Sequence, residues 1–148
     1  MKELAKNRKA FYNFQVLEKI EAGIALIGTE VKSCRAHNIS TADSFARIEN
    51  GEAFLYNVHI NEYDHGNRHN HDPIRVRKLL LKKSEIRKLA TATLAKGLTL
   101  VPLSFYLKKG RVKVTLGLCR GKSKGDKRET VRKREAEREM RKVMKMKS

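Results

Sequence analysis

Three histidines and two aspartates lie close together in the segment 63–73, and imidazole and carboxylate groups at short spacing can ligate zinc. The set comprises His65, His69, His71, Asp64 and Asp72. The segment is polar and contains Gly and Pro, which predicts a long exposed loop. A loop offers few neighbouring groups to orient metal ligands, so we expect no metal site. Contacts of the imidazoles with RNA phosphates or bases are a better use of them, although the sequence leaves their role open.

A basic run follows this loop directly. In an extended chain Arg75 and Arg77 lie on one face. Two forked guanidinium groups on one face suit adjacent phosphates, and Lys78 adds a third cation. The alternative is a solvated strand edge whose charges prevent aggregation.

Enzyme chemistry is not indicated. The serines at 33, 44 and 104 lack a Gly-x-Ser-x-Gly frame. Gly121-Lys122-Ser123 resembles the end of a phosphate-binding loop, but Leu116 stands where the first glycine is required. Glu21 and Glu30 have no pattern that would bring their carboxylates together. We therefore predict no catalytic residue and no cofactor.

The charge balance points to a nucleic-acid partner. The chain has 148 residues, with 34 Lys or Arg against 16 Asp or Glu and a net charge of +18. Phosphate neutralisation with release of counterions is the first use of such an excess, and a merely well-solvated basic surface is the alternative. Two cysteines are too few for a disulfide framework. No apolar run approaches the roughly 20 residues of a membrane span, so we expect a cytoplasmic protein without a membrane partner.

The last 29 residues differ from the rest. Residues 120–148 hold thirteen basic and five acidic side chains and no aromatic one. Such a segment buries too little apolar surface to fold alone, yet its residues are good helix formers. We expect a basic C-terminal tail over 120–148 that is disordered when free and helical when bound, and a folded domain over 1–119.

Alternating apolar residues predict two β-hairpins in that domain. One joins strands at 45–49 and 54–60 through Asn50-Gly51, a strong turn signal, with Phe54, Tyr56, Val58 and Ile60 on one face. The other turns at 108–110; residues 101, 103, 105 and 107 and then 112, 114, 116 and 118 face the core, and Gly117 and Cys119 face outward. Pro102 predicts an edge position or a bulge.

The remaining elements are predicted from shorter signals. The segments 11–20 and 22–34 read as strands separated at 21–23, with a bend at Gly28. A helix is expected from a cap at Ser84 to Gly97, with Ile86, Leu89, Ala90 and Leu94 on its core face. A short helical turn is possible at 40–44. Many short strands with one or two short helices predict a mainly β fold, a small closed or partly open barrel of the OB type.

Several segments, in order and correctly spaced, resemble the SmpB family of SsrA-binding proteins. They are Asn7-Arg8-Lys9-Ala10, Glu21-Ala22-Gly23, Gly28-Thr29-Glu30-Val31-Lys32-Ser33, Asn50-Gly51-Glu52-Ala53, Asp72-Pro73 with Arg75, Arg77, Lys78, Leu79, Leu80 and Leu81, and, near the C-terminus, Gly121-Lys122 and Asp126-Lys127-Arg128. The resemblance covers nearly the whole chain. It implies an OB-type barrel and a tail that is unstructured in free solution.

The resemblance also implies a function. Members of the family bind the tRNA-like domain of transfer-messenger RNA, reach the stalled ribosome with the GTP-bound elongation factor, and place the tail in the decoding centre and the vacant mRNA channel. Family RNA contacts correspond to Asn7, Glu21 and Leu80 here. With the basic positions, the predicted RNA-binding set is Asn7, Arg8, Lys9, Glu21, Lys32, Arg75, Arg77, Lys78 and Leu80. The predicted ribosome-contacting set in the tail is Gly121, Lys122, Asp126, Lys127 and Arg128.

Two positions depart from the family pattern. Cys34 stands where an aliphatic residue is usual, and a buried cysteine can replace it. Gly125 stands where many members have an aromatic residue or histidine for stacking. The function we predict is a non-enzymatic adaptor of ribosome rescue. The alternatives are a general OB-type RNA-binding protein and a metal-dependent RNA enzyme that uses the histidine loop.

Overall fold

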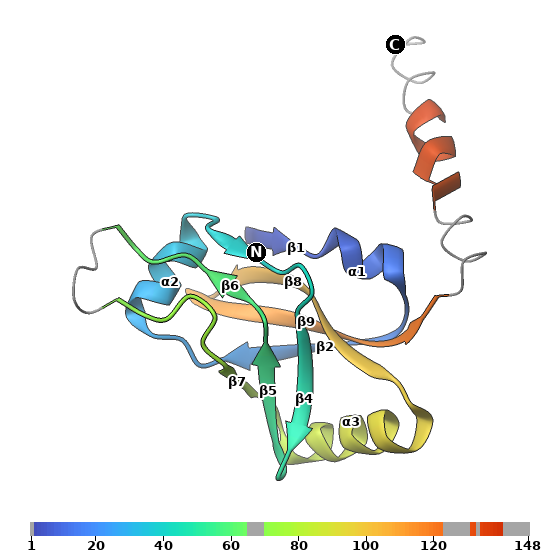
Figure 1. Cartoon of the computed structure of the whole chain (residues 1–148), viewed down its shortest axis with the longest axis horizontal. Helices are drawn as coiled ribbons and strands as arrows, with labels where there is room; N and C mark the ends of the chain where they lie inside the picture. The colour runs from blue at the N-terminus through green and yellow to red at the C-terminus, as the bar shows by residue number, and fades with distance from the viewer. Residues whose placement is uncertain (1, 65–69, 123–130, 133, 141–148) are drawn as a thin grey trace.

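The computed structural model describes residues 2–64, 70–122, 131–132 and 134–140. Its elements, in chain order, are β1 (Lys2–Lys6), α1 (Arg8–Asn13), β2 (Phe14–Ile24), α2 (Gly28–Arg35), β3 (Ile39–Ser40), β4 (Phe45–Glu49), β5 (Glu52–Tyr56), β6 (His59–Ile60), β7 (Arg77–Leu80), α3 (Lys83–Lys96), β8 (Thr99–Lys108) and β9 (Arg111–Gly121). The mainly β fold predicted from the sequence is confirmed (Figure 1).

The large sheet closes on itself. Its strand order is β1-β8-β4-β5-β7-β2-β9, and β8 also pairs with β9, so the strands from β8 to β9 form a closed antiparallel barrel. β8 has different neighbours along its length, because Leu100 pairs with Ala46 of β4 while residues 104–107 pair with β1. The register shifts between Pro102 and Ser104, which confirms the bulge predicted at the proline.

Both predicted hairpin turns are present. Asn50 and Gly51 have φ of 51° and 74°, and Lys109 and Gly110 have φ of 51° and 75°. Two consecutive residues in the left-handed region make the turn type whose twist matches the flanking strands. The alternation predicted for the first hairpin is wrong, because Ala53 and Leu55 are buried and the positive φ of Asn57 reverses the pattern before Val58.

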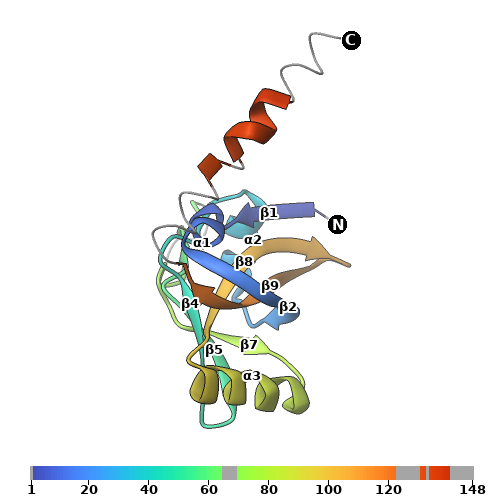
Figure 2. The ribbon, with the colours of Figure 1, turned by 90° about the vertical axis from the view of Figure 1, so that its right-hand side faces the viewer.

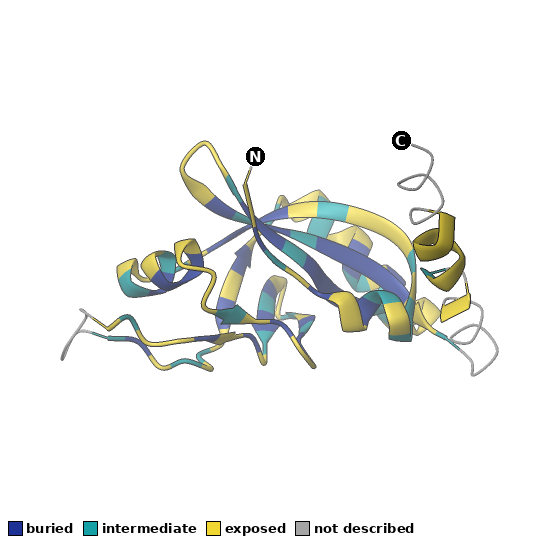
Figure 3. Cartoon of the chain, turned by 90° about the horizontal axis from the view of Figure 1, so that it is seen from above, coloured by how far each residue is buried: buried dark blue, intermediate teal, exposed yellow. Residues whose placement is uncertain are grey.

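The core fills the barrel, and helices pack against the barrel from outside. Leu55, Leu79, Phe105, Val114 and Leu116 are among the buried residues inside. α3 lies across one end of the barrel (Figure 2). A smaller cluster lies outside the barrel wall under α1, where Ala10, Val101, Leu103 and Cys119 are buried. Buried residues lie along the strands in Figure 3, whereas exposed residues lie on the turns, on the outer helix faces and on the outward positions of strands such as β2 and β7.

The cluster under α1 corrects two predictions. Gly117 and Cys119 are not exposed, because α1 covers this part of the outer barrel wall. A Cβ on Gly117 would lie 2.8 Å from Leu103 Cδ1, so a side chain at this position would displace the Leu103 side chain that packs over it.

Two segments predicted as strands are partly helical. Residues 8–13 form α1 because the Asn7 side chain accepts a hydrogen bond from Ala10 N at 3.1 Å and caps the helix. Residues 28–35 form α2, where Glu30 accepts from Ile27 N at 2.8 Å. Gly28 is therefore the first residue of α2, and the bend in a strand that was predicted at this glycine is absent. The break expected at 21–23 is also absent, since β2 pairs with β9 through these residues.

The predicted helix at 84–97 is confirmed as α3, with two differences. Its first turn is closed by Glu85, which accepts from Lys82 N at 2.9 Å, rather than by Ser84. Leu94 is 87% exposed instead of facing the core, where Leu89 and Ala92 pack. Gly97 ends the helix with φ 63°, as predicted.

The turn expected at 40–44 is a hydrogen-bonded turn without a helix, in which Ser44 N donates to Thr41 O at 3.2 Å. In the tail, residues 131–132 and 134–140 are helical, in line with the predicted helical tendency, and nearly all of them are exposed. Within the described ranges, no helix is long and apolar enough to cross a membrane.

Candidate nucleic-acid interface

An open groove on the outer barrel wall brings together three of the predicted RNA-binding residues. Glu21 on β2 and Lys78 and Leu80 on β7 line it, with Lys113 of β9 opposite. The groove has a volume of about 550 Å³ and ends against the first turn of α3. We call it the outer groove and define it by these four residues.

Leu80 forms a ridge in this groove. Its residue surface is 53% exposed. It pairs with Gly23 of β2, where a Cβ would lie 3.1 Å from Leu80 Cβ, so glycine permits the close approach of the two strands. A second hollow, of about 360 Å³, lies beyond Leu80 and is lined by Arg111 and Lys113 among others. An exposed apolar side chain between two hollows with cations on their walls suits a base and its phosphate.

Glu21 keeps a negative charge in the outer groove. The Tyr106 hydroxyl donates to its carboxylate, and Lys108 Nζ lies 3.3 Å from both oxygens. The hydrogen bond from Tyr106 holds the pKa of Glu21 below its usual range against the opposing effect of desolvation, and Lys108 and Lys113 act in the same direction as Tyr106. With 40% of its side chain exposed, the carboxylate can accept a hydrogen bond from a base amino group or a 2′-hydroxyl.

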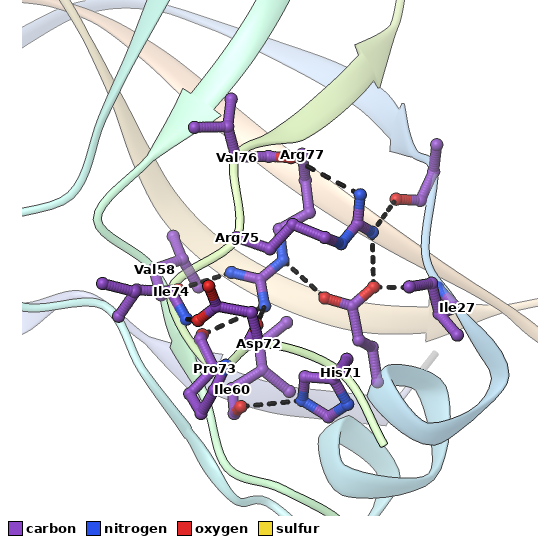
Figure 4. Close-up of polar contacts among 12 residues, drawn as sticks. Ile27, Val58, Ile60, His71, Asp72, Pro73, Ile74, Arg75, Val76 and Arg77 are labelled. Carbon is purple, nitrogen blue, oxygen red and sulfur yellow. Dashed lines mark hydrogen bonds and ion pairs between the residues drawn. The ribbon is translucent and has the colours of Figure 1, made fainter. Parts of the chain in front are cut away.

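A second carboxylate lies in a buried ion cluster, formed by Glu30, Arg75 and Arg77 and called the Glu30 cluster below. Arg77 Nε donates to Glu30 Oε2 at 2.6 Å, and Arg75 Nη2 donates to Glu30 Oε1 at 2.5 Å (Figure 4). The side chains of Glu30 and Arg77 are both 0% exposed. Arg77 also donates to Val58 O at 2.5 Å and Pro73 O at 3.1 Å.

This cluster corrects the role predicted for Arg77. A guanidinium that is fully buried and bonded to protein oxygens cannot reach a phosphate, so Arg77 fastens α2 and the segment 72–76 to the barrel. Arg75 lies at the rim with 34% of its side chain exposed. Burial alone would raise the pKa of Glu30, but hydrogen bonds from Arg75, Ile27 N and Arg77 hold that pKa below its usual range.

The predicted residues of the first helix are divided between two roles. Asn7 is 4% exposed; its amide donates to Pro102 O at 2.9 Å and its oxygen caps α1. The base contact expected of Asn7 is therefore not supported by its position. Arg8 and Lys9 are exposed on α1, and Lys9 Nζ lies 2.8 Å from the Asp43 carboxylate.

The histidine loop is anchored at its base. His71 is buried, with Nδ1 2.8 Å from Thr29 Oγ1 and Nε2 2.8 Å from Ile60 O. The prediction that the whole segment 63–73 is exposed is therefore wrong at His71. Lys32 is exposed on α2, and its ammonium lies 5.4 Å from the centroid of the Tyr63 ring. His65 and His69 lie outside the described residues. In the described part of the chain no three His, Cys, Asp or Glu residues gather as metal ligands would.

The comparison with known families decides the identity of the chain. The family model "SmpB protein" matches residues 4–146. The chain belongs to the SmpB family. The resemblance stated from the sequence is thereby confirmed.

Members of the SmpB family with high similarity include two SsrA-binding proteins. That of Levilactobacillus brevis is 58% identical over 142 residues, covering 96% of this chain and 90% of the relative. That of Caldicellulosiruptor saccharolyticus is 56% identical over 145 residues, covering 98% and 92%. The solved structure "tmRNA-SmpB: a journey to the center of the bacterial ribosome" contains a chain with a TM-score of 0.69 and 50% identity, covering 86% of this chain and 94% of that one.

The beginning of the SmpB-family tail is tied to the barrel. Gly121 pairs with Phe14 at the end of β9, Lys122 N donates to Asn13 O at 2.9 Å, and Lys122 Nζ donates to Phe11 O at 3.1 Å. Strand β9 thus runs two residues past the boundary expected at 119. Gly125, Asp126, Lys127 and Arg128 lie outside the described residues.

Sequence reasoning missed the Glu30 cluster and the role of Tyr106. Glu30 and Arg77 are 47 positions apart, and no local pattern links them. Lys113 could have been found, because strand alternation places it on the outer face next to Glu21.

Proposed function

We propose that this chain is an RNA-binding adaptor that binds the tRNA-like domain of transfer-messenger RNA and brings it to stalled ribosomes in trans-translation. The observation that carries the proposal is the family match over residues 4–146, together with 50% identity to a chain of the tmRNA–SmpB structure. The adaptor works without catalysis, in the cytoplasm, and meets the GTP-bound elongation factor indirectly through the RNA.

The outer groove is the centre of the RNA contact in this proposal. Leu80 packs against a base, Glu21 accepts from a base amino group or a 2′-hydroxyl, and Lys78 and Lys113 meet phosphates. Arg8, Lys9, Lys32 and Arg75 add exposed or half-exposed charge elsewhere on the domain. Residues 1–119 carry 21 basic and 11 acidic side chains, so phosphate attraction extends beyond the groove.

The tail serves the second partner, the ribosome. Gly121 and Lys122 fix its origin beside α1, and Asp126, Lys127 and Arg128 contact ribosomal RNA in the decoding region. The helix-forming, core-poor composition of 120–148 fits a segment that orders on an acidic surface.

Binding to a transcript of the tRNA-like domain tests the first part. The full chain should bind it more tightly than an unstructured RNA of equal length, and affinity should fall steeply with salt. Equal affinity for both RNAs would instead indicate a general RNA-binding protein, an alternative that the family match does not favour.

Truncation tests the second part. Because Lys122 is bonded to α1, the deletion should begin at residue 123 and leave β9 intact. The shortened protein should bind the tRNA-like RNA nearly as the full chain does and fail to support peptide tagging on stalled ribosomes. Tagging by the shortened protein would overturn the role of the tail.

A further inference from the structure

The outer face of the β4–β5 hairpin carries a group of aromatic and cationic side chains to which no role has yet been given. Phe45 and Tyr56 are opposite each other in the register, with ring centroids 5.3 Å apart and planes inclined by 9°. The guanidinium of Arg47 lies over both rings, 5.2 Å from the Phe45 centroid and 5.9 Å from that of Tyr56. We call these three residues the Arg47 platform.

The barrel core does not require this arrangement. The inward positions of the same strands are Ala46, Ala53 and Leu55, which are 6%, 1% and 0% exposed. Phe45 and Tyr56 are half-buried on the opposite face, and Arg47 is exposed. Of the acidic groups nearby, Glu49 accepts from the Tyr56 hydroxyl at 2.8 Å, and Arg47 takes part in none of the ion pairs found within the described ranges. The Arg47 guanidinium thus lies over an aromatic pair, and no carboxylate of the described residues forms an ion pair with it.

A hollow adjoins the platform. It has a volume of about 410 Å³, and its walls are Phe45, Arg47 and Ile48 on one side and Thr93, Leu94 and Leu98 on the other. The hollow lies where β4 and β8 diverge, since these strands share the single register pair Ala46–Leu100. Leu94, the α3 residue that the sequence placed in the core, forms the far wall with 87% of its surface exposed.

These features define the chemistry of a ligand. The ligand has a flat face that stacks on a guanidinium, an apolar edge that meets Leu94, and negative charge close by. An unpaired nucleobase with its phosphate meets all three conditions, because guanidinium planes and aromatic rings stack on bases of any sequence.

The platform is also connected to the outer groove. In the register, Arg47 is opposite Phe54, and Phe54 is opposite Lys78. Two strand spacings, roughly 10 Å, separate Arg47 from Lys78. One RNA strand can therefore contact the platform and the groove together, with Phe54 between Arg47 and Lys78.

We propose that the Arg47 platform, with the hollow between β4 and α3, is a second base-stacking site of this protein, which takes an unpaired nucleobase of the bound RNA. The identity of that RNA rests on the proposed function, but the stacking site does not. Arg47 supplies a planar stacking surface, and its charge alone is not sufficient.

The test compares Arg47→Lys, which keeps the charge and removes the plane, with the wild-type full chain. Arg35→Lys is the matched control, since Arg35 is exposed on α2 and lines none of the three hollows described above. Each protein is titrated with three RNAs at fixed salt: the tRNA-like domain, a fully paired hairpin of equal length, and single-stranded oligouridine. Thermal melting of each variant checks that the fold is unchanged.

Loss of one stacked base corresponds to a drop in affinity of roughly tenfold. We expect this loss for Arg47→Lys with the tRNA-like RNA and with oligouridine, and no loss with the paired hairpin or for Arg35→Lys. Unchanged binding of both RNAs with unpaired bases would overturn the proposal and leave this face to a protein partner. An equal loss with the paired hairpin would overturn it in favour of a phosphate contact.

The oligouridine arm separates this proposal from the proposed function. If the wild type does not prefer the tRNA-like RNA, the proposed function fails. In that case, weaker oligouridine binding by Arg47→Lys would still support the stacking site, and unchanged oligouridine binding would overturn it. Phe45→Leu, which removes one ring under Arg47, should lower oligouridine affinity in the same direction.

Discussion

The Glu30 cluster and the outer groove both place a carboxylate among cationic side chains, but they differ in how far these groups are exposed to solvent. Each has one carboxylate with nearby cations: Arg75 and Arg77 around Glu30, and Lys108 and Lys113 around Glu21. Glu30 is fully buried, whereas 40% of the Glu21 side chain is exposed. The charged groups of the Glu30 cluster bond to one another and to backbone oxygens, and these bonds hold α2 and the segment 72–76 on the barrel. In the groove, Lys78 lies 3.0 Å from the Glu52 carboxylate, but both side chains of that pair are about half exposed, so a ligand can compete for the lysine. Burial therefore decides between a structural role and a binding role.

Removing one partner from the Glu30 cluster should have the largest effect. Glu30→Gln leaves the Arg77 guanidinium buried without a counter-charge, and breaking such a pair typically costs about 3–5 kcal/mol of folding free energy. Urea unfolding followed by circular dichroism measures this loss. The double variant Glu30→Gln with Arg77→Met, which removes both charges, should recover part of it. A Glu30→Gln protein as stable as the wild type would mean that the two regions do not differ as described.

The sequence predicts the turns that shape the barrel, but it does not predict which charged residues are buried and which are exposed. Asn50-Gly51, the turn at 108–110 and Gly97 are local signals that act through their own φ values, and they predicted three features that the structure confirms. Arg75 and Arg77 were correctly placed near each other. Which of them points inward depends on Glu30, 47 positions away from Arg77, and no local pattern contains that contact.

The errors at α1 and α2 have a similar origin. Both segments contain residues that suit strands as well as helices. The Asn7 and Glu30 side chains accept hydrogen bonds from the backbone N–H groups of Ala10 and Ile27, and these bonds favour the helix. Glu21 and Leu80 became candidates through the family resemblance, because neither residue type is distinctive alone. The structure places them in one groove, which composition could not have shown.

The contribution of the buried carboxylate of Glu30 to stability should depend on pH. The pKa of Glu30 is lowered from 4.5 in the folded chain, so the unfolded chain takes up a proton first as the pH falls. The contribution of Glu30 to stability is therefore present above about pH 4.5 and is lost as the pH falls through the folded pKa. We expect the difference in unfolding free energy between wild type and Glu30→Gln to narrow below pH 4.5. A constant difference down to pH 3 would contradict this sign.

A substitution in the outer groove should weaken RNA binding and leave the free energy of unfolding nearly unchanged. Leu80→Ala removes an exposed apolar contact, and we expect roughly fivefold weaker binding of the tRNA-like RNA, equivalent to about 1 kcal/mol. The unfolding midpoint should move little, because Leu80 is 53% exposed. Leu17→Ala is the matched control on β2, since Leu17 is 43% exposed and does not line the groove. Loss of stability without loss of RNA binding would place Leu80 with the Glu30 cluster instead.

The smallest effect should come from the exposed pair of Lys9 and Asp43, whose separation is only slightly longer than those in the Glu30 cluster. Lys9 Nζ lies 2.8 Å from the Asp43 carboxylate, with 55% and 75% of the two side chains exposed. Solvent screens such pairs, and they contribute about 0–1 kcal/mol. Asp43 has a φ of 61°, a conformation that asparagine also tolerates, so Asp43→Asn removes the charge without backbone strain.

We expect Asp43→Asn to change the unfolding free energy by less than about 0.5 kcal/mol. RNA binding should strengthen slightly and become more salt-dependent, because Lys9 loses a competing carboxylate. The urea and RNA titrations used for Glu30→Gln and Leu80→Ala measure both quantities. A loss of stability comparable to that of Glu30→Gln would show that distance, and not burial, sets the strength of these ion pairs.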